Sequence, residues 1–307
     1  SDGPHRTCAF RSGGIDRVYR TPLMALVLLL LVTTGSADDA RQARREAIIG
    51  CMATYDGEPR TADRRVDIPL LLEQLEQYHA NTYDFLIWHR ETDWTDLKEF
   101  LRATRGSDLK VWVSLVPPSE SRETMSEPFG LDYIKWGERI GRLSSIYPNL
   151  VAWSIDDFTH NLSFYTPEYL GRMLDAAHAA NPNLAFVPCT YFSKVSPQFA
   201  ADYGTLLDAL LFYYRHESDG ANLTDATLCD EEIARVRQTM GPDIPVILGF
   251  YATGHSRLGS SSPEYVEQVM TLAHEHADGI HVYTHVHPES EKGRVIRRLF
   301  EQWSPQR

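Results

Sequence analysis

Cysteine is scarce in this chain, which has 4 cysteines among 307 residues. Three of them, Cys51, Cys189 and Cys229, lie in the part with an ordinary globular composition, and their spacing forms no Cys-x-x-Cys pair. An odd number without paired spacing argues against a disulfide framework and against a common thiolate zinc site. Cys51 and Cys189 lie within apolar stretches, where a free cysteine usually acts as a small buried side chain.

Positive charge is also in short supply. The chain has 30 Lys and Arg against 42 Asp and Glu, so its formal net charge is −12 at pH 7. An acidic surface repels phosphate backbones, and nucleic acid is therefore not expected as a partner. A neutral or cationic substrate suits such a surface better.

The sequence has no apolar run of the roughly 20 residues that a membrane helix needs. Its longest apolar block, PLMALVLLLLV at residues 22–32, follows two arginines and precedes a Thr-Thr-Gly-Ser-Ala segment. This pattern predicts a secretory signal peptide that is cleaved after Ala37, with an N-terminal membrane anchor as the alternative. We therefore expect residues 1–37 to be an extension with a signal peptide and residues 38–307 to be the folded domain. The mature chain should be secreted or periplasmic, without a stable membrane span.

No glycine-rich nucleotide loop follows the first predicted strand, which argues against an open doubly wound sheet. Short apolar runs rich in β-branched and aromatic residues alternate instead with amphipathic helix patterns. Strict alternation predicts a parallel sheet with helices outside, and eight such units indicate an α/β fold, a single-domain (β/α)8 TIM barrel. The predicted strands are residues 48–55, 82–88, 109–116, 150–156, 184–191, 206–213, 245–251 and 278–284.

In such a barrel the active site lies at the carboxyl ends of the strands, so the strand ends locate candidate site residues. Aromatic and charged residues dominate these ends. This is typical of sugar sites, where ring faces stack on sugar C–H surfaces and carboxylates handle protons. The candidates for substrate binding are Asp56, Trp88, Arg90, Tyr191, Tyr213, Arg215, Tyr251, Tyr283 and His285.

Two adjacent acids, Asp156 and Asp157, end the fourth predicted strand. Burying a charge is costly, so neighbouring acids at the end of an apolar strand need a partner or a use. Close carboxylates also raise one pKa, which suits a general acid working near neutral pH. These two residues are the predicted catalytic pair. The alternative is that one caps the following loop and the other pairs with Arg90 or Arg215.

The segment IDDFTHNL at residues 155–162 resembles the catalytic Asp-Asp segment of glycoside hydrolase family 84, the β-N-acetylglucosaminidases of the O-GlcNAcase type. The segment FVPCTY at residues 186–191 is similar to that family's fifth-strand segment. The resemblance covers about residues 150–192. It implies substrate-assisted catalysis, in which Asp156 orients a 2-acetamido group and Asp157 protonates the leaving oxygen.

Elsewhere the chain departs from the family pattern. The family's first strand ends in Gly-Phe-Tyr-Gly, whereas this chain has Ala-Thr-Tyr-Asp-Gly at residues 53–57. The family's Trp-Asp-Asn segment on the seventh strand is replaced by Gly-Phe-Tyr-Ala at residues 249–252. The resemblance therefore implies the catalytic step and leaves the identity of the sugar open.

His281, Tyr283, His285 and His287 alternate with apolar residues at the last predicted strand, so their side chains share one face. The outer face of a barrel strand packs on helices, and these side chains should therefore point into the barrel or its mouth. Their spacing is compatible with metal ligation, although no motif ties a third ligand to them. Histidines that line a sugar site are the alternative.

The sequence thus predicts a secreted glycoside hydrolase with a carbohydrate substrate, with Asp156 and Asp157 at its centre, and without a metal or other cofactor. Two alternatives stay open. One is a metal-dependent hydrolase or lyase that uses His281 and His285, and the other is a carbohydrate-binding barrel without activity. The fold cannot choose among them, because this barrel hosts many functions.

Overall fold

The computed structural model describes residues 37–120 and 126–304. Contacts group Gly35–Arg307 into one compact unit. Apart from Ala37, the predicted signal peptide lies outside the described residues. None of the helices in the described part of the chain has the length and apolar character needed to cross a bilayer.

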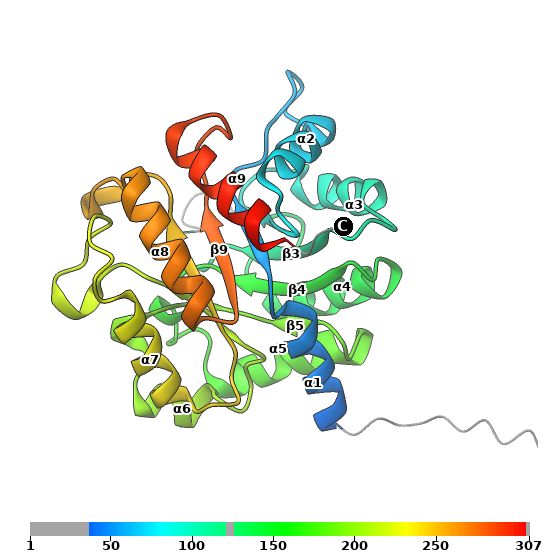
Figure 1. Ribbon diagram of the computed structural model, residues 1–307. Helices are drawn as coiled ribbons and strands as arrows, with labels where there is room; N and C mark the ends of the chain where they lie inside the picture. The colour runs from blue at the N-terminus through cyan, green and yellow to red at the C-terminus, as the bar shows by residue number, and fades with distance from the viewer. Residues whose placement is uncertain (1–36, 121–125, 305–307) are drawn as a thin grey trace, which may run out of the picture. The chain divides into compact units, whose positions relative to one another are not determined.

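Strands and helices alternate through this unit, as the sequence predicts (Figure 1). The strands are β1 (Met52–Tyr55), β2 (Thr82–Ile87), β3 (Lys110–Leu115), β4 (Leu150–Ile155), β5 (Ala185–Phe186), β6 (Cys189–Tyr191), β7 (Leu210–Tyr213), β8 (Val246–Tyr251) and β9 (Gly279–Tyr283). The helices are α1 (Ala37–Ile48), α2 (Ile68–Tyr78), α3 (Asp93–Ala103), α4 (Tyr133–Ile146), α5 (Pro167–Ala180), α6 (Pro197–Tyr203), α7 (Cys229–Met240), α8 (Pro263–His276) and α9 (Glu291–Trp303).

The strands form one parallel sheet in the order β5-β4-β3-β2-β1-β9-β8-β7-β6. Its two edge strands, β5 and β6, are separated only by Val187 and Pro188, so they are two pieces of the fifth predicted strand. The Val187 N–H donates to Trp153 O at 3.0 Å, and the Leu211 N–H donates to Pro188 O at 3.1 Å. Because this interrupted strand bonds to both neighbours, the sheet closes on itself and the fold is a (β/α)8 barrel.

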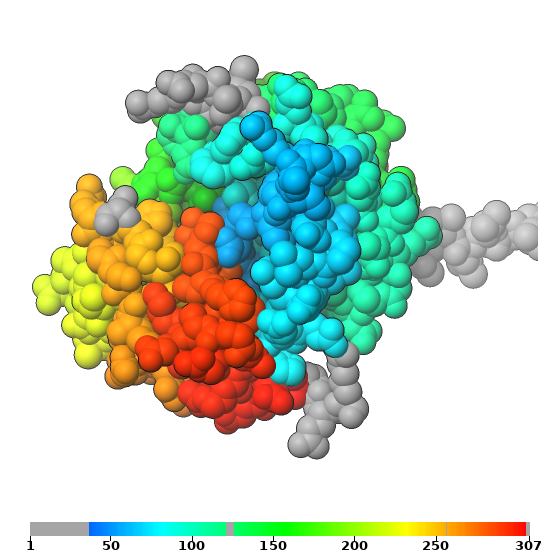
Figure 2. Space-filling model, turned by 90° about the horizontal axis from the view of Figure 1, so that it is seen from above, coloured from blue at the N-terminus to red at the C-terminus, as the bar shows by residue number. Residues whose placement is uncertain are grey.

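The closure also brings the first and the last strand together. β1 pairs with β9 in parallel, with Tyr55 opposite Tyr283. Figure 2 shows the result from above, where the blue and cyan residues that follow β1 lie against the red residues of α9.

The wall of the barrel separates two apolar cores, because successive side chains of a strand point to opposite faces. Ala152 belongs to the inner core that fills the barrel, whereas its neighbour Trp153 belongs to the outer core between the sheet and the helices. Asp156 has the same parity as Ala152. The pattern of β4 therefore turns the side chain that follows the strand toward the mouth of the barrel.

The predicted first strand is wrong for residues 48–51. Ile48 ends helix α1, and β1 begins only at Met52. Ile48 is fully buried in the inner core, so α1 closes the amino-terminal end of the barrel. Arg44 of the same helix holds it there through a buried ion pair with Asp208 at 2.8 Å. A buried helix end directly before a strand carries the same apolar signal as the strand itself, which is why the sequence pattern merged the two.

Candidate active site

A pocket of about 310 Å³ opens at the carboxyl ends of β1, β4, β6, β7, β8 and β9. This is the end of the barrel at which catalytic sites are found, and the size lies at the small end of the range for ligand pockets, roughly 300–1,000 Å³. The predicted site residues that line it are Asp156, Asp157, Tyr191, Tyr213, Arg215, Tyr251 and Tyr283, and the others are Tyr55, Glu120, His160 and His255.

Asp156 follows β4 directly and is only partly exposed. Its backbone N–H donates to Leu115 O at 2.9 Å, which continues the strand ladder. The Tyr55 hydroxyl donates to its Oδ2 at 3.2 Å, and the Asp157 N–H donates to its Oδ1 at 2.9 Å. Burial and the charge of Asp157 raise the pKa of Asp156 to about 6, although these hydrogen bonds act in the other direction. Asp156 therefore changes its charge near neutral pH.

Asp157 has a left-handed backbone, with φ 46° and ψ 29°, where the chain turns from β4 into a short 3-10 helix (Phe158–His160). Aspartate is one of the few non-glycine residues that tolerate this conformation. Its Oδ1 accepts a hydrogen bond from the Tyr191 hydroxyl and lies 3.6 Å from Nδ1 of His160. Burial alone would raise the pKa of Asp157, but the hydrogen bonds from His160 and Tyr191 outweigh it and lower the pKa. Asp157 is held as a carboxylate.

Glu120 brings a third carboxyl group into the pocket, from the loop after β3. Its side chain shares a hydrogen bond with Asp157, and burial together with the charges of Asp156 and Asp157 raises its pKa to about 8. The sequence prediction missed this residue. It stands five positions beyond the end of the strand in a Pro-Pro-Ser-Glu stretch without periodicity, so no sequence pattern placed it at the site.

Tyr191 was predicted to offer its ring face to a sugar, but protein groups already lie against that ring. The His160 ring stacks on it with centroids 4.6 Å apart, and the Arg215 guanidinium carbon lies 3.7 Å from its centroid. Tyr191 is only 3% exposed, and its hydroxyl is used by Asp157. Arg215 in turn donates from Nε to Glu217 at 2.9 Å, which balances its charge. These residues support the Asp157 carboxylate rather than form an open stacking surface.

The remaining tyrosines form a continuous wall. The ring centroid of Tyr251 lies 5.0 Å from that of Tyr213 and 5.3 Å from that of Tyr283. A Cβ built on Gly249 would lie 2.5 Å from the Tyr213 ring, so this ring packs directly on the backbone of β8. Tyr213 and Tyr251 are 3% and 5% exposed, whereas Tyr283 is partly exposed. Among these predicted stacking residues, Tyr283 has the most ring surface left for a ligand.

His281 and His285 of the last predicted strand lie in two different places. His281 is buried, with Nε2 2.9 Å from Asp84 Oδ2 and Nδ1 3.0 Å from the Tyr213 hydroxyl. Both of its ring nitrogens are therefore occupied. His285 lies at the mouth, with Nδ1 2.6 Å from Asp56 Oδ1. This arrangement does not support a metal site made by His281 and His285.

Within the described residues, one group has donor atoms close enough to meet at a metal ion. Asp156, Asp157 and Cys189 each offer an atom within 4.8 Å of the others. Burial raises the pKa of the Cys189 thiol well above its ordinary value, whereas a thiol must ionise to bind a metal. Carboxylates suit hard cations and thiolates suit soft ones, so this mixed set fits no common metal well.

Four predicted substrate-binding residues lie outside this pocket. Asp56 and His285 line a neighbouring pocket of about 310 Å³ next to α2, and the His285 ring lies 4.4 Å from that of Tyr283. Trp88 is 45% exposed and stands edge-on to His89, and neither Trp88 nor Arg90 lines either pocket. These four residues therefore lie at the rim, whereas Tyr55 at the end of β1 lines the central pocket.

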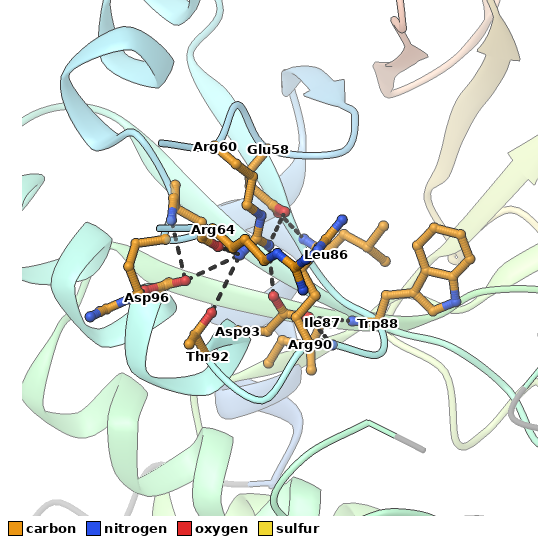
Figure 3. Close-up of polar contacts among 12 residues, drawn as sticks. Glu58, Arg60, Arg64, Leu86, Ile87, Trp88, Arg90, Thr92, Asp93 and Asp96 are labelled. Atoms are coloured by element: carbon orange, nitrogen blue, oxygen red, sulfur yellow. Dashed lines mark hydrogen bonds and ion pairs between the residues drawn. The ribbon is translucent and has the colours of Figure 1, made fainter. Parts of the chain in front are cut away.

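An ionic cluster, the Arg60 network, fixes the loops after β1 and β2 (Figure 3). The Arg60 guanidinium lies 2.7 Å from Asp93, 3.2 Å from Asp96 and 3.3 Å from Glu58, and all three carboxylates are buried. Asp93 also accepts from the Trp88 N–H at 3.1 Å. Figure 3 shows the Trp88 ring pointing away from the cluster, so the network fixes the backbone of this rim segment and leaves its ring free.

Three further pocket residues were not predicted as site residues. Tyr55 ends β1 and bonds to Asp156, and its strand-end position was a usable signal. His160 lies within the Asp-Asp segment, one helical turn after Asp157, which explains its reach to that carboxylate. His255 comes from the loop after β8, and its ring lies 4.5 Å from that of Tyr251. No sequence pattern distinguished His255 from an ordinary loop histidine.

No family model matches the chain, and a search of the curated proteins finds no match. The similar solved structures include a β-D-glucuronidase of Dictyoglomus thermophilum, at 15% identity and a TM-score of 0.55, which covers 83% of this chain and 50% of that one. An endoglucanase of Pseudomonas stutzeri has 8% identity and a TM-score of 0.55, covering 81% of this chain and 93% of that one. A β-methylaspartase of Clostridium tetanomorphum has 10% identity and a TM-score of 0.52, covering 87% and 62%.

The chain spans half the length of that glucuronidase. At such identities the likeness shows the fold alone. The same barrel fold is thus shared by enzymes named for different reactions. The reaction of this chain therefore has to be inferred from the residues of its pocket.

Proposed function

We propose that this chain is a glycoside hydrolase whose reaction takes place among Asp156, Asp157 and Glu120. The observation that carries the proposal is the set of three carboxyl groups in one small pocket, with pKa values shifted in opposite directions. Glycoside hydrolysis needs one carboxyl group that holds a proton and another that bears charge. The tyrosine wall suits a sugar ring, and the shared fold of glycosidases agrees with this assignment.

We further propose a 2-acetamido sugar as the substrate. The resemblance of residues 155–162 to family 84 gives Asp156 the task of orienting the acetamido group, which attacks the anomeric carbon in place of an enzyme nucleophile. The Tyr55 hydroxyl and the Asp157 N–H hold the Asp156 carboxylate in place. Its charge would stabilise the positive charge that develops on the cyclised intermediate. The small volume of the pocket favours a single sugar ring at this point.

The test is hydrolysis of a panel of aryl glycosides with and without a 2-acetamido group, each with and without EDTA. We expect turnover of the 2-acetamido substrates, unchanged by EDTA. Turnover only of substrates without the group would contradict substrate assistance, and binding without any turnover would favour a carbohydrate-binding barrel. Activity lost in EDTA and restored by zinc or manganese would favour the second candidate, a metal-dependent enzyme that uses Asp156, Asp157 and Cys189.

We also propose that the chain is exported and processed after Ala37, which would make it secreted or periplasmic. The apolar block at residues 22–32 and the small residues that follow it support this. Amino-terminal sequencing of the protein recovered from its native host should find a start near Asp38. An intact amino terminus in a membrane fraction would identify the block as an anchor instead.

A further inference from the structure

Glu120 and Asp157 both line the pocket, and their side chains share a hydrogen bond. Glu120 comes from the loop after β3, and Asp157 from the turn after β4. Two carboxyl groups can share a hydrogen bond only when one of them carries the proton, because an ionised carboxylate only accepts. The pair therefore has a single proton, and the surrounding donors decide which residue holds it.

The surroundings of Asp157 favour its ionised form. The Tyr191 hydroxyl donates to its Oδ1, and the His160 ring nitrogen lies 3.6 Å from the same oxygen. The Tyr191 ring is held in turn by the stacked His160 ring and by the guanidinium of Arg215. Hydrogen-bond donors that point at a carboxylate lower its pKa. The donors around Asp157 lower its pKa although burial alone would raise it.

The surroundings of Glu120 favour its protonated form. Burial and the nearby charges of Asp156 and Asp157 both disfavour a second negative charge on Glu120, and its pKa rises to about 8. At neutral pH the shared proton therefore lies on Glu120, which points into the same pocket as Asp156.

We propose that Glu120 is the catalytic proton donor, and that Asp157 is a positioning residue that holds the Glu120 carboxyl group through their shared hydrogen bond. This rests on the proposed glycoside hydrolase function and replaces the role that the family resemblance gives to Asp157. The general acid is then Glu120, in the loop after β3, rather than Asp157 of the Asp-Asp pair.

The reaction balances with these roles. The glycosidic C–O bond breaks with its electron pair on the leaving oxygen, and the proton of Glu120 leaves its hydrogen bond to Asp157 and passes to that oxygen, while the 2-acetamido oxygen bonds to the anomeric carbon beside Asp156. Water then bonds to the anomeric carbon, the acetamido oxygen leaves with its electron pair, and the proton lost by the water returns to Glu120. Asp157 stays ionised throughout, and its charge favours the return of the proton to Glu120.

A comparison of leaving groups tests this assignment. We expect Glu120→Gln to lower kcat/KM by about 10²–10⁴-fold on an alkyl glycoside, which needs a proton on its leaving oxygen, and by much less on an aryl glycoside with an acidic phenol. Asp157→Asn should show the same leaving-group dependence with a smaller loss on the alkyl glycoside, because it disturbs the position and the pKa of the donor and does not remove it. The reverse pattern, with leaving-group dependence in Asp157→Asn alone, would overturn the proposal.

A second measurement locates the proton without any turnover, so it separates failure of this inference from failure of the proposed function. Infrared spectra at pH 7 should contain a carbonyl band of a protonated carboxyl group that is lost in Glu120→Gln and kept in Asp157→Asn. Glu58→Gln is the matched control, because burial also raises the pKa of Glu58 to about 8 but Glu58 does not line the pocket. This control should lose a different band and keep the leaving-group dependence of the wild type. A spectrum that Glu120→Gln leaves unchanged would show that the proton lies elsewhere.

Discussion

An Asp156→Asn variant is expected to lose about 10²–10³-fold in kcat, and to do so on alkyl and aryl glycosides alike. The loss is independent of the leaving group because Asp156 is proposed to stabilise positive charge beside the anomeric carbon, which develops whatever departs. Asparagine keeps the shape and can still meet the Tyr55 hydroxyl and the Asp157 N–H, so the change removes mainly the charge. Steady-state kinetics on both kinds of substrate measure the effect.

The pH profile provides the control for this variant. The pKa of Asp156 is raised to about 6, and its ionised form is the working form, so wild-type activity should fall as the pH drops through about 6. The acidic limb should be absent from Asp156→Asn, whose residual rate stays flat across that range. A small loss on both substrates, with the limb unchanged and the melting temperature lowered, would mean that Asp156 serves the fold rather than the reaction.

An Arg60→Ala variant is expected to lose about 3–5 kcal/mol of unfolding free energy, the usual cost of removing one partner from a buried ion pair. Arg60 is the cation shared by Glu58, Asp93 and Asp96, whose side chains are 1–3% exposed. Without it, the buried Asp93 carboxylate loses its cation, and the buried side chains of Asp96 and Glu58 each lose a partner. Urea denaturation, followed by circular dichroism, gives the difference in free energy.

Arg65→Ala is the matched control for Arg60→Ala. Arg65 also pairs with Asp96, but its side chain is 33% exposed and its removal leaves Arg60 in place. We expect a loss of about 1 kcal/mol or less, as for other solvent-exposed ion pairs. Equal losses of unfolding free energy in the two variants would show that the contribution of these ion pairs to stability does not depend on their burial.

The sequence predicts the barrel and the centre of its pocket because both follow from periodic patterns. The alternation of strand and helix patterns can be recognised even where a single element is irregular. In this fold the carboxyl ends of all strands lie at the same end of the barrel. Asp156 and Asp157 could be singled out since two acids interrupt an apolar strand pattern. The structure places both in the pocket, whereas their roles stay predictions.

Contacts that depend on loops could not be predicted in the same way. Glu120 reaches the pocket through a loop whose path no local rule determines. Trp88 and Arg90 fail to reach it because the Arg60 network, made by ion pairs between residues up to 36 positions apart, holds their loop at the rim. The sequence also shows that Tyr191 ends a strand, but it cannot show that His160 and Arg215 already lie against the ring.

Because the fifth strand is broken between β5 and β6, the contacts that close the barrel lie next to the pocket residue Asp157. Beyond the hydrogen bond from the Val187 N–H to Trp153 O, the fifth strand is joined to the turn after β4 through side-chain groups. The Tyr191 N–H donates to Thr159 Oγ1 at 3.3 Å, and the Tyr191 hydroxyl donates to Asp157. The contacts that complete the ring of strands are thus the ones that set the charge of a pocket carboxylate. In evolutionary terms, an inherited change at Tyr191 is expected to alter the stability of the barrel and the charge of the Asp157 side chain together.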